Sequence, residues 1–348
     1  MPDLAQYGWD ESLERDFRAL GLPDTVPGRI AVDYGQNYLV VTEAGDVRAD
    51  MSGRYRLAVK KGEALKPAVG DWVAVEKVGD GQAILHAVLP RRSKLSRKVA
   101  GRATEEQVVA ANVDTVFLVT AANVEVNLRK LERNLTLAWE SGARPVLVFT
   151  KADLCDDPAA VEAAARSIAG KAPVYLVSNA TGAGLEDLRA ELQPGRTVVL
   201  VGVSGVGKSS LVNAWLGYER QATGAVREQD QKGRHTTTHR ELFVLPGGAL
   251  VIDTPGVREL ALWEGEQGIA EAFPDVVELA KGCRFGDCRH EKEPGCAVQA
   301  AVAEGALSAE RYAAYRKLAA ELAEMERLQA ERARTTARRA ARPPPRKR

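Results

Sequence analysis

The pattern of apolar positions changes along the chain from short stretches to longer runs. Residues 1–26 form a polar lead-in that could be helical. Between Gly28 and about Pro90, apolar stretches of strand length alternate with turn-forming residues. Five short strands within about 65 residues indicate a small β-barrel. The first interpretation is an OB fold, although the pattern alone does not separate it from an SH3-like barrel.

From about residue 105 the apolar runs alternate with amphipathic segments, which favours an α/β domain. Val113–Val119 predicts a buried strand, and Asn127–Trp139 predicts a helix with one apolar face. Further apolar runs of strand length are Pro145–Phe149, Tyr175–Val177, Val198–Val201 and Leu250–Ile252. After these runs, Ser308 is predicted to cap a helix whose apolar stripe contains Tyr315, Leu318, Leu322 and Met325.

A glycine-rich motif of the form G-x-x-x-x-G-K-[ST] follows Val198–Val201 and leads into the helical pattern Leu211–Leu216. Strand, loop and helix are the context that a phosphate-binding loop requires. Lys208 is expected to reach the β- and γ-phosphates, and the Ser209 hydroxyl to bind Mg²⁺. The motif alone would also fit a generic ATP-binding loop or a chance match in a glycine-rich turn. The predicted nucleotide contacts are Gly202, Val203, Ser204, Gly205, Val206, Gly207, Lys208, Ser209 and Ser210.

Three other strand ends carry the remaining signatures of a GTPase. Asp253-Thr254-Pro255-Gly256 fits D-x-x-G, Thr150-Lys151-Ala152-Asp153 occupies the place of a guanine motif, and Ser178-Asn179-Ala180 ends the next run. The switch threonines near residue 237 are the second of the five GTPase signatures. Along this chain the five signatures occur in the order fourth, fifth, first, second, third. The domain is therefore interpreted as a circularly permuted GTPase. Permutation is tolerable because the ends of a compact domain often lie close together.

The guanine motif predicts base selection by a carboxylate. Asp153, expected to be buried, would accept hydrogen bonds from guanine N1–H and N2–H₂, which adenine does not offer. The Lys151 stem would lie along the base, and the backbone at Asn179 and Ala180 would contact the guanine carbonyl. Thr150 stands where asparagine is usual, but its hydroxyl can still bond to a neighbouring loop, so we expect guanine specificity to be retained.

The switch residues predict the Mg²⁺ site and a slow reaction. Residues 219–234 are polar and contain glycine, as expected of a first switch, and we expect Thr237 to bind Mg²⁺ with Ser209 and Asp253. The Gly256 N–H would contact the γ-phosphate. Val257 occupies the place of a water-orienting glutamine, so intrinsic turnover should be slow, about 10⁻⁴–10⁻² s⁻¹. His235 is the hypothetical catalytic replacement; the alternative is a histidine that only packs or contacts RNA.

Three of the four cysteines cluster with one histidine as Cys283-x4-Cys288-x-His290-x5-Cys296. Three thiolates and an imidazole are a usual ligand set for structural zinc, and a closed set of four leaves no position for catalysis. The alternative is three ordinary buried thiols beside a surface histidine. The clustering in a cysteine-poor chain favours one structural Zn²⁺. Cys155 is expected to be a packing thiol.

Charge is balanced overall but uneven locally. The 348 residues carry a net charge of +1 and 45% hydrophobic residues, which indicates a soluble globular protein. Basic residues gather in Arg91–Lys98 and in the tail 327–348, and both are expected to contact nucleic acid. Arg48, Arg54, Arg56, Lys60 and Lys61 on the barrel suit the same role, or are solvated loop charge. No signal-peptide pattern or membrane-length apolar run occurs, so a cytoplasmic location is expected.

Barrel, permuted GTPase domain and zinc cluster, in that order, resemble the bacterial ribosome small subunit-dependent GTPase A family (RsgA) over about residues 28–325. Pro90-Arg91-Arg92-Ser93, Gly202–Ser210 and Gly233–Thr238 add to the resemblance. It implies a GTP hydrolase, stimulated by the 30S subunit, that acts late in assembly of that subunit and binds 16S rRNA. The implied cofactors are GTP or GDP, Mg²⁺ and one Zn²⁺. We expect the protein to be a monomer and to have no DNA or membrane partner.

Two other functions stay open. One is a GTP-regulated switch for another RNA or protein. The other is a P-loop kinase, which is less favoured because Asp153 and the D-x-x-G motif have no required place in a kinase.

The predicted organisation is multidomain. It consists of a lead-in (1–26), an OB-fold RNA-binding barrel (27–92), a basic linker (93–104), the GTPase domain (105–275), an α-helical zinc module (276–326) and a disordered Arg/Pro-rich tail (327–348).

Overall fold

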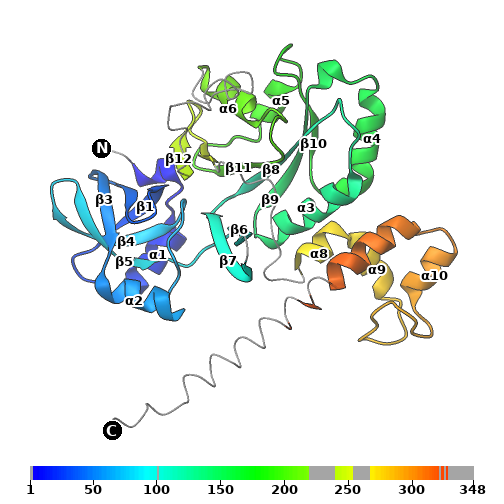
Figure 1. Cartoon of the computed structure of the whole chain (residues 1–348), viewed down its shortest axis with the longest axis horizontal. Helices are drawn as coiled ribbons and strands as arrows, with labels where there is room; N and C mark the ends of the chain where they lie inside the picture. Colours follow the sequence, from blue (N-terminus) through cyan, green and yellow to red (C-terminus); the bar gives the residue numbers. More distant parts are fainter. Residues whose placement is uncertain are drawn as a thin grey trace, which may run out of the picture.

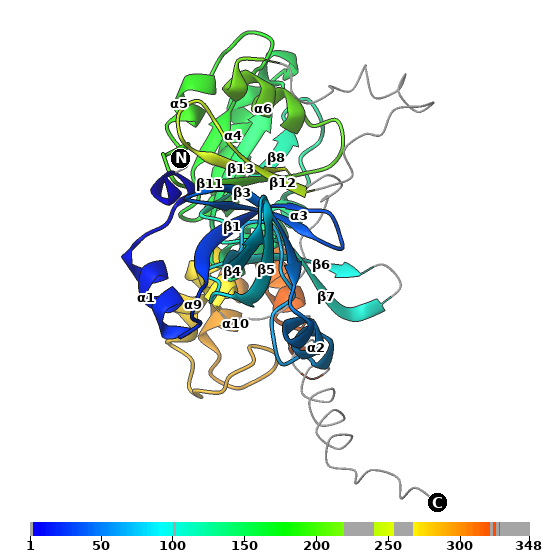
Figure 2. The same cartoon turned by 90° about the vertical axis from the view of Figure 1, so that its left-hand side faces the viewer.

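The computed structural model describes residues 3–99, 102–218, 240–253 and 267–320, together with residues 323, 324 and 327. Its first five strands close a barrel in the order β1–β2–β3–β5–β4–β1 (Figure 2). They are β1 (Val26–Asp33), β2 (Tyr38–Thr42), β3 (Gly45–Met51), β4 (Trp72–Gly79) and β5 (Gln82–Val88). The predicted N-terminal barrel is confirmed.

A helix, α2 (Gly53–Lys61), connects β3 to β4. Ser52 caps it by accepting a hydrogen bond from the Tyr55 N–H, and the buried Tyr55 ring anchors it to the barrel. Of the five basic residues for which loop positions were considered, Arg48 lies on β3 and the other four lie on this helix. Those on its exposed face are Arg54, Arg56, Lys60 and Lys61.

The lead-in folds as η1 (Leu4–Tyr7) and α1 (Glu11–Ala19), with Asp10 capping α1. Trp9 packs edge-on against Trp72 of the barrel, with ring centroids 4.8 Å apart. This contact fixes the lead-in to the barrel wall.

An antiparallel hairpin, β6 (Lys94–Val99) with β7 (Arg102–Ala111), follows the barrel. The interval 93–104, expected as a linker, thus holds one strand and the start of another. Arg91 is nearly buried and donates to both carboxylate oxygens of the fully buried Asp71, each at 2.7 Å. The expectation that the whole basic run contacts nucleic acid is therefore wrong for Arg91, whose guanidinium stabilises the barrel.

The α/β domain is built on six strands in the order β10–β9–β8–β11–β13–β12. All neighbours are parallel except β12, which is antiparallel to β13. Their bounds are β8 (Thr115–Ala121), β9 (Arg144–Thr150), β10 (Val174–Leu176), β11 (Thr197–Val201), β12 (Arg240–Val244) and β13 (Leu250–Asp253). Parallel neighbours bring the carboxyl ends of these strands to one edge.

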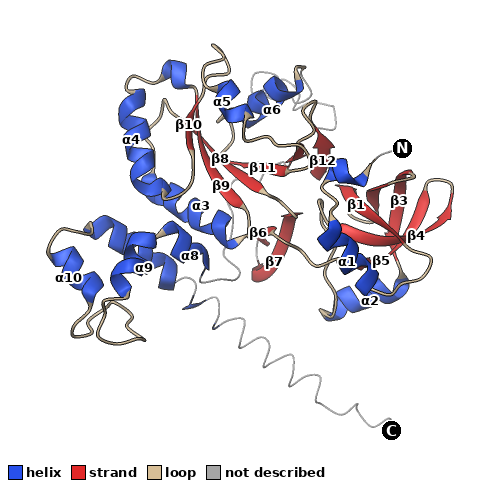
Figure 3. Cartoon of the chain, turned by 180° about the vertical axis from the view of Figure 1, so that it is seen from behind, coloured by secondary structure: helices blue, strands red, loops and turns tan. Residues whose placement is uncertain are grey.

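Helices cover both faces of this sheet (Figure 3). One face packs against α3 (Leu128–Glu140) and α4 (Pro158–Ala169), and the other against α5 (Leu185–Arg189) and α6 (Lys208–Leu216). Successive side chains of β8 point to opposite faces of the sheet. Leu118 packs on the face covered by α3 and α4, and Phe117 packs on the face covered by α5 and α6. The predicted helix at Asn127–Trp139 is confirmed, and Asn127 is its N-cap.

The barrel and the α/β sheet are joined edge to edge (Figure 1). β12 pairs with the end of β1, with Val32 opposite Glu241 and Asp33 opposite Arg240. A register shift between Ile30 and Val32 lets β1 leave its barrel neighbour β4 and turn toward β12. The strand that follows the predicted first switch is thus hydrogen-bonded to the barrel.

The C-terminal module contains α8 (Gln267–Ala272), α9 (Pro274–Ala280), α10 (Ala297–Ala303) and a helix over 309–320. Ser308 caps the last helix through a 3.1 Å bond from the Arg311 N–H, as predicted. Leu318 is buried in the core, whereas Leu322 and Met325 lie outside the described side chains. Among the described residues, no helix has the length and apolar character needed to cross a membrane.

Arg311 fastens this module to the α/β domain. Its guanidinium donates to Asp275 at the start of α9, to the Ala272 carbonyl, and to Glu132 of α3 at 2.8 Å. Glu132 is buried, and burial raises its pKa while the Arg311 charge opposes that rise. Removing the guanidinium would leave a buried carboxylate without its cation.

Arg311→Met is therefore expected to lower the free energy of unfolding of the C-terminal module by about 3–5 kcal/mol. Arg316→Met is the matched control, because Arg316 lies on the same helix and pairs with the exposed Glu291, where about 0.2–1 kcal/mol is expected. Urea unfolding followed by hydrogen exchange in residues 309–320 measures both. Equal effects of the two substitutions would contradict the role given to Arg311.

Candidate nucleotide-binding edge and metal centre

The loop between β11 and α6 has the backbone geometry needed to surround a phosphate. Gly205 and Gly207 adopt left-handed φ angles of +81° and +96°. A Cβ on Gly202 would lie 2.2 Å from the Val119 carbonyl oxygen, so only glycine fits there. Gly207 has no side chain with which to cap α6, and the amino end of a helix is a favourable place for a phosphate.

Lys208, the first residue of α6, directs its charge over this loop. Its Nζ lies 2.7 Å from the Gly202 carbonyl oxygen and 2.8 Å from that of Val203. The ammonium therefore stands within the loop that would hold the phosphates. This placement fits the expected contact with the β- and γ-phosphates.

Thr150 links the guanine motif to the phosphate loop. Its side chain is fully buried at the end of β9, and its hydroxyl lies 2.5 Å from the Val206 carbonyl oxygen and 3.2 Å from that of Thr120. The shorter contact is a donated hydrogen bond that fixes one loop against the other. Threonine thus makes the neighbouring-loop bond expected of it in place of asparagine.

Thr150→Val keeps the shape but removes this bond and leaves the buried Val206 carbonyl without its donor. The expected cost is about 1–3 kcal/mol of unfolding free energy, with a loss of roughly tenfold in GTP affinity. Thr136→Val is the control, since within the described residues that buried hydroxyl bonds to the Glu132 carbonyl of its own helix and to no other segment. Thermal unfolding and nucleotide titration of both variants test the link; GTP affinity equal to that of the control variant would refute it.

Asp153 lies at the base-selecting position and is held by Ser178. The Ser178 hydroxyl donates to Asp153 Oδ1 at 2.5 Å and accepts from the N–H groups of Ala180 and Thr181. The expectation of a buried Asp153 is wrong, because its side chain is exposed on the short helix η2 (Ala152–Leu154). The serine's role in orienting this carboxylate was not anticipated, since the pair is separated by 25 residues.

The carboxyl edge of the sheet brings the described motif residues together. The phosphate loop follows β11, Asp253 ends β13, Thr150 ends β9, and Ser178 follows β10. Ser209 and Asp253 are on this edge and offer the hydroxyl and carboxylate oxygens that Mg²⁺ prefers. The predicted residues outside the described part of the chain are His235, Thr237 and Gly256.

The cysteine–histidine cluster has the dimensions of a tetrahedral zinc site. The ligand atoms of Cys283, Cys288, His290 and Cys296 all lie within 4.8 Å of one another. His290 Nδ1 is 3.5 Å from Cys283 Sγ and 3.4 Å from Cys296 Sγ, and those sulfurs are 3.9 Å apart. Tetrahedral zinc separates sulfur from nitrogen by about 3.6 Å and two sulfurs by about 3.8 Å. The residues therefore fit the metal.

Neighbouring groups hold the histidine in place. His290 has a left-handed φ of +59°, and its carbonyl oxygen accepts hydrogen bonds from Gln299 Nε2 and the Tyr312 hydroxyl. Burial lowers the pKa of His290, which favours the neutral imidazole needed for metal binding. Tyr312 belongs to the last helix, so the cluster and that helix stabilise each other.

A phosphate loop, a carboxylate at the base-selecting position and this strand order define a circularly permuted P-loop GTPase. The RsgA GTPase family profile matches residues 88–263, and the chain belongs to that family. The chain is 47% identical over 330 residues to Small ribosomal subunit biogenesis GTPase RsgA of Opitutus terrae, which covers 92% of this chain and 90% of the relative. The relative of the same name from Streptomyces coelicolor is 44% identical, covering 90% and 85%.

Two solved structures share the architecture. YjeQ from Thermotoga maritima matches with a TM-score of 0.63 and 30% identity, covering 86% of this chain and 98% of its own. YloQ, described as a circularly permuted GTPase, matches with a TM-score of 0.62 and 29% identity, covering 86% and 96%. These matches agree with the permuted order of the motifs.

Proposed function

We propose that the chain is a GTPase of late 30S ribosomal subunit maturation, which binds 16S rRNA and hydrolyses GTP with stimulation by the small subunit. The observation that carries the guanine assignment is Asp153, held by Ser178 on the same sheet edge as the phosphate loop. The names of the relatives from Opitutus terrae and Streptomyces coelicolor support the ribosomal role.

In this proposal the N–H groups of α6 and the Lys208 ammonium hold the phosphates. Ser209, Thr237 and Asp253 would hold Mg²⁺, which supplies charge to neutralise the phosphate oxygens. Val257 does not orient water, so turnover is slow without the subunit, and His235 is the proposed group that acts on water. His235→Ala should remove most of the 30S-stimulated hydrolysis while leaving nucleotide affinity unchanged; unaltered stimulated turnover would remove His235 from the reaction.

The connections between the parts support a nucleotide-dependent partner. β12 lies between the predicted first switch and β13, and it pairs with the barrel, so a change in switch conformation can reach the barrel through backbone bonds. The D-x-x-G motif begins at Asp253 and leads toward the C-terminal module. GTP-bound protein should therefore bind purified 30S subunits more tightly than GDP-bound protein. Sedimentation with each nucleotide measures this difference, and equal binding would count against the proposal.

A further inference from the structure

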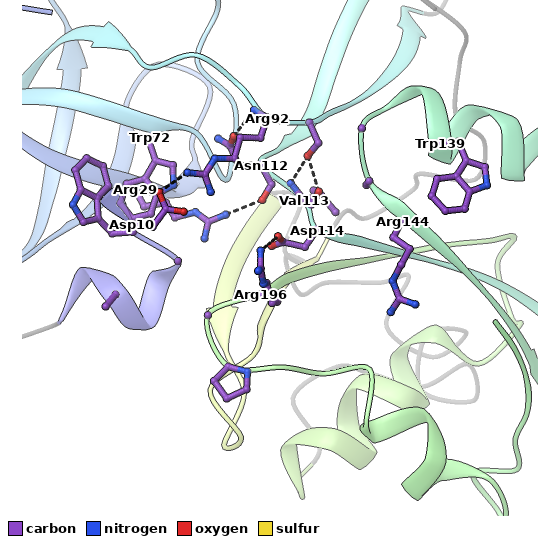
Figure 4. Close-up of a pocket in the computed structure, with 18 residues that line it drawn as sticks. Asp10, Arg29, Trp72, Arg92, Asn112, Val113, Asp114, Trp139, Arg144 and Arg196 are labelled. Carbon is purple, nitrogen blue, oxygen red and sulfur yellow. Dashed lines mark hydrogen bonds and ion pairs between the residues drawn. The ribbon is translucent and has the colours of Figure 1, made fainter. Parts of the chain in front are cut away.

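A cleft of about 530 Å³ lies at the opposite edge of the sheet from the phosphate loop. Its floor is the amino ends of β8, β9 and β11, and the lead-in and barrel form one wall (Figure 4). The five residues of β11 lie between this edge and the phosphate loop, and at about 3.3 Å for each residue they span about 17 Å. We call this space the amino-edge cleft. Its size suits a ligand as large as a nucleotide.

Arginines outnumber carboxylates in the amino-edge cleft. Four arginines and two aspartates line it, and the arginines still outnumber the carboxylates when Glu191, the partner of Arg144, is counted. Arg29 is 2% exposed and donates to the carbonyls of Tyr7, Gly70 and Asn112 and to the Thr197 hydroxyl. These acceptors are all neutral, so a buried positive charge lies in the cleft wall without a carboxylate among its hydrogen-bond partners in the described residues.

Two exposed arginines are held ready to contact an anion. Arg196 Nη1 bonds to Asp114 at 2.8 Å, and Arg144 Nη2 bonds to Glu191. Within the described part of the chain, the remaining N–H groups of these two guanidiniums have no hydrogen-bond partner, and the side chains are 59% and 43% exposed. A guanidinium already fixed by one carboxylate loses little freedom when it binds phosphate through its other donors.

Aromatic surface completes the site. Trp9 and Trp139 line the cleft and are partly exposed, and Figure 4 shows Trp139 on the same side of the cleft as Arg144. Indole faces stack on any nucleobase, whereas arginine forks match phosphate oxygens. Fixed arginines beside two partly exposed tryptophans favour a nucleotide over a bare inorganic anion.

We propose that the amino-edge cleft is a second nucleotide-phosphate site, in which Arg144 and Arg196 bind the phosphate and an indole stacks on the base. The same chemistry occurs in a free nucleoside monophosphate and in a strand of RNA. None of the residues of the phosphate loop lines the cleft, so the site is separate from that loop.

Calorimetric titration of the full chain, saturated with GDP and Mg²⁺ to fill the phosphate loop, tests this proposal. The probes are adenosine 5′-monophosphate, which has a terminal phosphate, and the dinucleotide ApU, which has only a phosphodiester. At least one probe should bind with a Kd below about 1 mM. Binding of ApU identifies RNA as the ligand source, and binding of the monophosphate alone identifies a free nucleotide.

Arg144→Gln combined with Arg196→Gln should weaken that binding by about tenfold or more, since two charge-assisted bonds are lost. Arg166→Gln is the matched control, because Arg166 forms an exposed ion pair with Glu162 on α4 and does not line the cleft. Unchanged GDP affinity shows that the double variant is folded. A Kd above about 1 mM for both probes, or equal binding by the double variant and the unmutated protein, would overturn the proposal.

Discussion

Replacing Asp153 by Asn is expected to lower the affinity for GTP by about 10²–10⁴-fold, because two hydrogen bonds to a charged acceptor are lost. The asparagine amide presents a donor where guanine N2 also donates. Xanthine carries a carbonyl at that position, so xanthosine triphosphate should bind the variant better than it binds the unmutated protein. Ser178 donates to the carboxylate and would still orient an amide oxygen.

Asp156→Asn is the control for this substitution, because Asp156 is an exposed carboxylate three residues further along the chain. It should leave the affinities for GTP and xanthosine triphosphate unchanged. Fluorescence titration with both nucleotides and with ATP measures the preference. Equal affinity of the unmutated protein for ATP and GTP would remove Asp153 from base selection.

Replacing Cys288 and Cys296 by Ser is expected to remove zinc and unfold the C-terminal module. Structural zinc contributes about 10–16 kcal/mol in small domains, far more than the short helices around the cluster can replace. Without the metal, His290 would no longer be held in place, and its carbonyl oxygen is the hydrogen-bond acceptor of Gln299 and Tyr312. The loss should therefore spread from residues 283–299 into the last helix, through Tyr312.

Native mass spectrometry should find one zinc in the unmutated protein and none in the double variant, with hydrogen exchange rising across residues 283–320. Cys155→Ser is the control, because this half-buried thiol lies outside the cluster and should leave zinc in place. A purified protein without zinc whose C-terminal module is as protected as the metal-bound form would contradict the assignment.

Many features of this architecture could be predicted from local sequence patterns. The phosphate loop, the cysteine cluster and the Ser308 cap are each formed by residues within one short segment, the longest being the 13 positions from Cys283 to Cys296, so their spacing reflects their geometry. The five parallel α/β strands were visible as apolar runs because helices cover both faces of the sheet, whereas the antiparallel β12 was not predicted. The barrel was visible through its regular turns, and its closure is a consequence of twist and strand length.

Contacts between distant segments were not predictable in this way. Arg311 and Glu132 are 179 residues apart, and Arg29 and Thr197 are 168 apart, so no spacing rule connects them. The pairing of β12 with β1 depends on a bulge that turns β1 out of the barrel. Arg91 seemed a surface cation because its sequence neighbours are basic, and only the folded chain shows Asp71 beside it.

The central claim is that the small ribosomal subunit stimulates this GTPase, and its most direct test is the rate of GTP hydrolysis with purified 30S subunits. We expect about 10⁻⁴–10⁻² s⁻¹ without subunits and at least a tenfold higher rate with 30S. Purified 50S subunits at the same concentration should leave the rate unchanged. If 30S and 50S subunits have the same effect, the ribosomal assignment is wrong and a GTP-regulated switch for another partner explains the chain better.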